Sequence, residues 1–105
     1  MDLAGKKLGL LLSASPEQPN FARAIELAGA ALERGVQVYF YCLDDAVAGL
    51  NDPRLQKLKA RGINLFACAY GAQRRNLTLG GLATFAGLST VNDLIANTDR
   101  FISLN

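Results

Sequence analysis

The sequence contains no histidine, and this absence excludes more functions than any residue that is present supports. Without histidine, the chain has neither a Cys–His nor a Ser–His catalytic pair, and it has no histidine-based metal site. Its two cysteines, Cys42 and Cys68, lack neighbouring ligands and cannot build the usual four-ligand zinc site. The glycine motifs that cradle nucleotide phosphates, G-x-G-x-x-G and G-x-x-x-x-G-K-[ST], are also missing. We therefore expect no metal and no cofactor, and what remains is oxidative or nucleophilic chemistry at a thiol.

A strong charge imbalance and a long apolar run are missing as well. The 11 Lys and Arg nearly balance the 9 Asp and Glu, and a net charge of +2 gives no reason to expect a nucleic-acid partner. No apolar run is long enough for a membrane helix, and the early LGLLL stretch has no small-residue cleavage site of a signal peptide after it. We expect a cytoplasmic protein with no membrane contact, in which cysteines are more often reduced than bridged.

Short apolar runs alternate with helical patterns along the 105 residues, which the length and the 50% hydrophobic composition assign to a single domain, 1–105. Strands are predicted over 6–13, 36–42, 63–68, 82–87 and 100–104. Helices are predicted from Phe21 to a C-cap at Gly35, near 53–61, over 70–77, and over 89–98 with Ser89 as its N-cap. This alternation predicts an α/β fold, a three-layer α/β/α domain with a mostly parallel five-stranded sheet, although it does not give the strand order.

In open parallel sheets, ligand sites lie at the carboxyl ends of the strands. Ser13, Cys42, Cys68 and Gly87 all fall at these ends, so both thiols are expected at the same edge of the sheet. Cys68 also directly precedes a predicted helix, whose first N–H groups stabilise a thiolate.

Less specific interpretations of these residues stay open. A cysteine that ends an apolar strand is often a buried core residue, which applies to Cys68 and more strongly to Cys42, whose other interpretation is a resolving or second relay thiol. Asp44 and Asp45 fit turn and helix-cap positions better than a general-base role. The aromatic run 39–41 cannot all point inward from one strand, so at least one ring is expected to be exposed or in an interface.

The stretch CAYGAQRRN resembles the active-site segment of the DsrE/TusD (DsrE/DsrF-like) group of sulfur-relay proteins. The stretches KLGLLLSASP, ALERGVQVYFYCLDDAV and FAGLSTVNDLIANTDRFISL agree with the family in the same order, so the resemblance covers nearly the whole chain, with Asn76 where the family often has glycine. It implies that Cys68 carries sulfur as a persulfide and passes it to a partner protein. The site residues that we assign are Cys68, with Ser13, Gly71, Arg74 and Arg75 in support and Cys42 as a possible second thiol.

Two classes of function therefore remain. The first is a sulfurtransferase-like carrier with sulfur donor and acceptor proteins as partners, in which Arg74 and Arg75 either place positive charge near the sulfur or are simply solvated. The second is a non-catalytic binding or assembly subunit in which Cys68 is inert. A homo-oligomer is expected in both, because the VYFY and LTLGGLATF runs hold more apolar surface than one small sheet covers. The resemblance also implies a homo-oligomer, as a dimer, trimer or hexamer.

Overall fold

The computed structural model describes residues 3–74 and 81–105, and within them five parallel strands form one sheet in the order β4-β3-β2-β1-β5. The strands are β1 (Lys7–Leu12), β2 (Gln37–Cys42), β3 (Asn64–Cys68), β4 (Thr84–Ala86) and β5 (Arg100–Leu104). The predicted α/β fold is confirmed, and every strand pair is parallel. All carboxyl ends of the strands therefore meet at one edge of the sheet.

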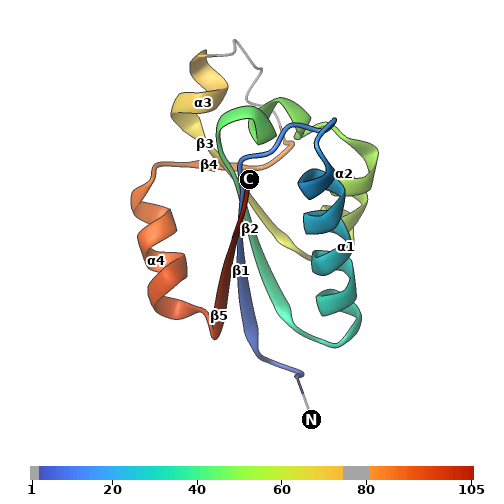
Figure 1. Ribbon diagram of the computed structural model, residues 1–105. Helices are drawn as coiled ribbons and strands as arrows, with labels where there is room; N and C mark the ends of the chain where they lie inside the picture. The colour runs from blue at the N-terminus through green and yellow to red at the C-terminus, as the bar shows by residue number, and fades with distance from the viewer. Residues whose placement is uncertain (1–2, 75–80) are drawn as a thin grey trace.

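Helices cover both faces of this sheet (Figure 1). One face packs against α1 (Pro19–Glu33), with α2 (Pro53–Ala60) beside it, and the other face packs against α4 (Ser89–Asn97). The 3₁₀ helix η1 (Asp44–Gly49) and α3 (Ala69–Arg74) directly follow β2 and β3 at the carboxyl edge. None of the helices in the described part of the chain has the length and apolar character needed to span a bilayer.

Two local predictions need correction. Ser89 is the first helical residue of α4 rather than its N-cap, because the preceding turn already bonds the Thr90 N–H to the Gly87 carbonyl and the Val91 N–H to the Leu88 carbonyl. The helix predicted over 70–77 begins at Ala69, and residues 75–77 of the predicted range lie outside the described residues.

The aromatic run on β2 is more buried than its sequence suggested. Phe40 and Tyr41 are both fully buried on opposite faces of the sheet, while Tyr39 is half-buried. None of the three rings is fully exposed, because β2 is the central strand of the sheet. An interface position for Tyr39 stays a prediction.

Candidate functional site

Cys68 ends β3, and its sulfur lies against the first turn of α3. The Gly71 N–H donates a hydrogen bond to Cys68 Sγ at 3.4 Å, and 8% of Cys68 is exposed. The chain passes directly from strand to helix here, and this places a backbone donor three residues ahead beside the side chain of the last strand residue. Cys68 is thus a nearly enclosed thiol with a preformed hydrogen-bond donor.

The hydroxyl of Tyr41 is the second polar group at this sulfur. It donates to the Ala86 carbonyl at 2.9 Å, and Ala86 is the register partner of Cys68 on the next strand. Burial raises the pKa of Tyr41 well above its ordinary value, and the charge of the Cys68 thiolate and the side-chain hydrogen bond to Cys68 raise it further. The phenol therefore stays protonated at neutral pH.

Cys42 lies at the same edge in a different environment. It is in register with Ala67, so its side chain leaves the sheet on the face opposite to that of Cys68. Cys42 is fully buried, and burial raises the pKa of its thiol to about 12. Both cysteines are free, and the structure does not bring them to one face.

The supporting residues predicted from the sequence fall into three groups. Gly71 contacts the Cys68 sulfur through its N–H. Ser13 is separated from β3 by β2, and its hydroxyl donates to Asn105 Oδ1 at 3.0 Å instead. Arg74 is the last residue of α3, but its side chain and the whole of Arg75 lie outside the described residues, as does Asn76.

Asp44 and Asp45 follow Cys42 as exposed residues in the first turn of η1, and no side-chain cap is formed there. Among the described residues, no group of three His, Cys, Asp or Glu side chains lies close enough to hold a metal ion.

Sequence analysis missed Tyr41 as a site residue. Its hydroxyl meets Cys68 only because β2, β3 and β4 are neighbours, and the sequence does not give the strand order. The alternation of side chains along β2 and β3 could have placed Tyr41 and Cys68 on one face, but only with the register known.

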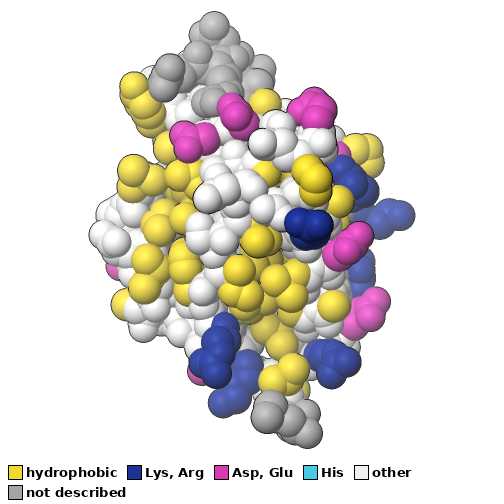
Figure 2. Space-filling view, in the orientation of Figure 1, with side chains coloured by type: hydrophobic (Ala, Val, Ile, Leu, Met, Phe, Trp, Pro, Cys, Tyr) yellow, Lys and Arg dark blue, Asp and Glu magenta, His cyan; other side chains and the backbone are white. Residues whose placement is uncertain are grey.

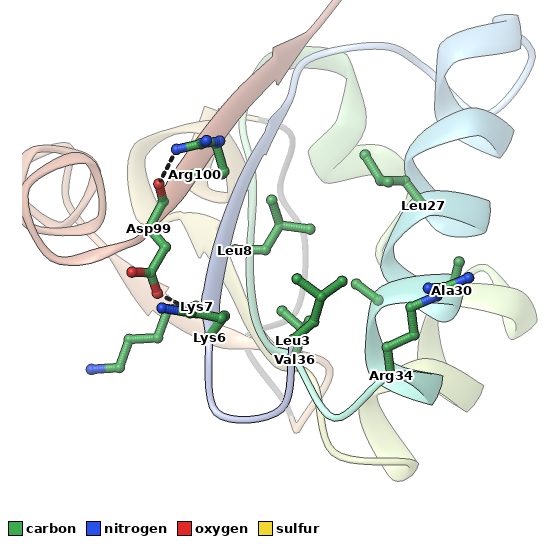
Figure 3. Close-up of a pocket in the computed structure, with 11 residues that line it drawn as sticks. Leu3, Lys6, Lys7, Leu8, Leu27, Ala30, Arg34, Val36, Asp99 and Arg100 are labelled. Carbon is green, nitrogen blue, oxygen red and sulfur yellow. Dashed lines mark hydrogen bonds between the residues drawn. The ribbon is translucent and has the colours of Figure 1, made fainter. Parts of the chain in front are cut away.

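A hollow of about 570 Å³ opens at the opposite end of the sheet, between α1 and the beginnings of β1 and β5 (Figure 3). Leu3, Leu8, Leu27 and Val36 supply most of its apolar lining. At its rim, Arg100 donates to the Asp99 backbone carbonyl, and the Asp99 carboxylate accepts from the Lys7 backbone N–H at 2.7 Å. The hollow lies far along the strands from Cys68 and shares no residue with its surroundings.

The fold defines a class of small α/β proteins built on one parallel sheet with helices on both faces. The sequence matches the model of the DsrE/DsrF-like family over residues 6–104, and the chain belongs to this family.

Two solved structures show the same fold. The ychN protein from E. coli superposes with a TM-score of 0.82 at 15% sequence identity, over 94% of this chain and 99% of that one. A conserved protein of unknown function from Bacteroides thetaiotaomicron, BT1422, superposes with a TM-score of 0.78 at 17% identity, over 94% of this chain and 95% of that one. No protein of curated function matches this chain.

Proposed function

We propose that this protein is a small sulfur carrier that accepts sulfane sulfur on Cys68 as a persulfide and passes it to the thiol of a partner protein. Membership of the DsrE/DsrF-like family supports a sulfur-relay role. The observation that carries the assignment to Cys68 is the Gly71 N–H bonded to its sulfur, in a chain whose other cysteine is fully buried.

The transfer needs no external oxidant or reductant. The Cys68 thiolate attacks the outer sulfur of a donor persulfide, a new S–S bond forms at Sγ, and the donor's S–S bond breaks with its electron pair leaving on the donor thiolate. In the second step an acceptor thiolate attacks the outer sulfur, and Cys68 leaves as a thiolate. The Gly71 N–H bonds the same atom while it is the nucleophile and while it is the leaving group.

Low exposure suits this chemistry. With 8% of the residue in contact with solvent, Cys68 is shielded from most bulk solvent but, unlike Cys42, is not fully buried. The low exposed fraction of Cys68 also favours the second candidate, a non-catalytic binding or assembly subunit with an inert Cys68. Buried free cysteines are common core residues. The two functions differ in whether the thiol takes up sulfur.

Sulfur loading on defined variants tests the proposal. After incubation with polysulfide, mass spectrometry should find one added sulfur, mapped to Cys68, in the wild type and in Cys42→Ser, and none in Cys68→Ser. A matched control is Ala67→Cys/Cys68→Ala, which moves the thiol by one residue to the fully buried face and should load none, with its melting temperature as the check on folding. If Cys68→Ser loaded sulfur at the wild-type rate, the carrier function of Cys68 would be refuted, and the non-catalytic binding or assembly subunit would be favoured instead.

The proposal includes a homo-oligomer in the cytoplasm, with sulfur donor and acceptor proteins as partners. Its support is apolar surface: Leu88 and Ile95 of the α4 region are 59% and 53% exposed, and Tyr70 beside Cys68 is 66% exposed. Figure 2 shows hydrophobic side chains gathered over α4 and between β5 and α1. Light scattering at micromolar concentration should give a multiple of the 11.2 kDa chain mass, and a monomer mass would contradict it.

A further inference from the structure

The side chain of Tyr41 crosses from one strand over a second to a third. It starts on β2, and its hydroxyl donates to a backbone carbonyl of β4, that of Ala86. Because β3 lies between these two strands, the ring must pass over the end of β3. The residue of β3 in register with Ala86 is Cys68, on the same face of the sheet as Tyr41. The hydroxyl is therefore held between the Ala86 oxygen and the Cys68 sulfur.

A phenol has one proton and can give it to one of these two atoms at a time. When Cys68 is a thiol, the S–H can donate to the Tyr41 oxygen, and the O–H donates to the Ala86 carbonyl as the structure shows. When Cys68 is a thiolate, it has no proton to give and needs donors instead. Rotation of the O–H about its C–O bond then directs the phenol proton to the sulfur, opposite to the Gly71 N–H.

We propose that Tyr41 is a positioning residue for the Cys68 thiolate, with a hydroxyl that turns from the Ala86 carbonyl to the sulfur when Cys68 ionises. No proton passes between the two side chains, and the proton of the thiol leaves to solvent or to the base that removes it. The role in sulfur transfer rests on the proposed function, while the hydrogen bond to the thiolate does not. High burial supports the arrangement, because it keeps the phenol from ionising in place of the thiol.

The competing explanation is a purely structural one, in which the Tyr41 hydroxyl only ties β2 to β4. That explanation predicts a loss of stability when the hydroxyl is removed, with no change in how Cys68 responds to pH. The pH profile of Cys68 alkylation by iodoacetamide separates the two explanations, because only the thiolate reacts.

Tyr41→Phe removes the hydroxyl and keeps the ring. In the Cys42→Ser background, we expect the pH midpoint of Cys68 alkylation to rise by about one unit, which means about tenfold slower reaction below the midpoint. Tyr39→Phe is the matched control, since Tyr39 lies on the same strand and face and its hydroxyl bonds Gln37 at 3.3 Å, away from Cys68. An unmoved midpoint in Tyr41→Phe, or an equal shift in Tyr39→Phe, would overturn the proposal.

A second experiment strengthens the Tyr41 hydroxyl as a donor instead of removing it, so that the proposal can be tested even if Tyr41→Phe does not fold. Incorporation of 3-fluorotyrosine in a chain carrying Tyr39→Phe and Tyr70→Phe leaves Tyr41 as the labelled ring, with a more acidic and stronger donor hydroxyl. The midpoint should then fall relative to the same chain with ordinary tyrosine, and an unchanged or raised midpoint would contradict the proposal. Neither measurement uses a sulfur donor. A chain that shows these shifts but loads no sulfur would refute the carrier function and leave the Tyr41 hydrogen bond standing.

Discussion

Cys42 should be almost unreactive in the folded protein, although it stands at the same sheet edge as Cys68. Its thiol is fully buried, and burial raises its pKa from 9.0 to about 12. Each pKa unit reduces the thiolate fraction tenfold at a pH below both values, so the reactive form should be about a thousand times rarer than in an exposed thiol. Limited access of the reagent adds to this effect.

The measurement uses Cys68→Ser, in which Cys42 is the remaining cysteine. The folded variant is treated with iodoacetamide at pH 7.5, and the alkylated peptide is quantified by mass spectrometry over time. The same variant unfolded in urea gives the rate of an ordinary thiol. We expect the folded rate to be lower by a factor of about a thousand or more. Comparable rates in the folded and unfolded chain would refute the burial argument and restore Cys42 as a candidate relay thiol.

The same shift has a consequence for stability at alkaline pH. A thiol whose folded pKa is raised stabilises the fold fully below its unfolded value of 9.0, and this contribution is lost as the pH rises toward about 12. The loss amounts to about 4 kcal/mol at most, a large part of the stability of a small domain. Urea unfolding between pH 8 and 10 should show a steeper decline in the wild type than in Cys42→Ala, and equal slopes would contradict the shift.

Three further predictions concern packing, capping and sulfur uptake. Gly49→Ala should cost about 1–3 kcal/mol of unfolding free energy, because a Cβ there would lie 2.6 Å from an aromatic carbon of α1; an unchanged urea midpoint would contradict this. Asp52→Ala should cost about 1 kcal/mol at pH 7, because Asp52 caps α2 through the Arg54 N–H. Hydrogen bonding to Arg54 lowers the pKa of Asp52, so the difference between variant and wild type in urea unfolding should shrink below pH 3.8, and a constant difference would argue against the cap. Replacing Arg74 and Arg75 by Ala should slow sulfur uptake, with a stability change within about 0.5 kcal/mol; unchanged uptake would make them ordinary solvated residues.

The alternation of apolar runs and helical patterns was sufficient to predict the fold class and the edge at which Cys68 lies. This works because each element carries its own local signal. The nearly continuous apolar run of β1 reflects a strand covered on both faces. Gly35, predicted as the C-cap of the first helix, lies one residue beyond the C-cap Arg34, with a positive φ of 79° that favours glycine. The Ser89 cap failed for an equally local reason, since backbone carbonyls of Gly87 and Leu88 had already met the first N–H groups of the α4 turn.

The surroundings of the sulfur were not predictable in the same way. The contact between Tyr41 and Cys68 joins residues 27 positions apart through strand order and register, and neither is a property of a local stretch. Ser13 shows the converse, because its place at a strand end was predicted correctly, yet β2 lies between its strand and that of Cys68. Position at the carboxyl edge is thus a necessary condition for the site and not a sufficient one.

Register also explains why two cysteines that both end strands have different chemistry. Cys42 pairs with Ala67, so the last residue of β3 has no partner within β2 and points to the other face. On the Cys42 side, the sheet is closed by the buried core that α1 completes. On the Cys68 side, the chain turns at once into α3 and brings a backbone N–H to the sulfur. A difference of one residue in where the paired strands end therefore separates a thiol enclosed by apolar side chains from one with a backbone hydrogen-bond donor at its sulfur.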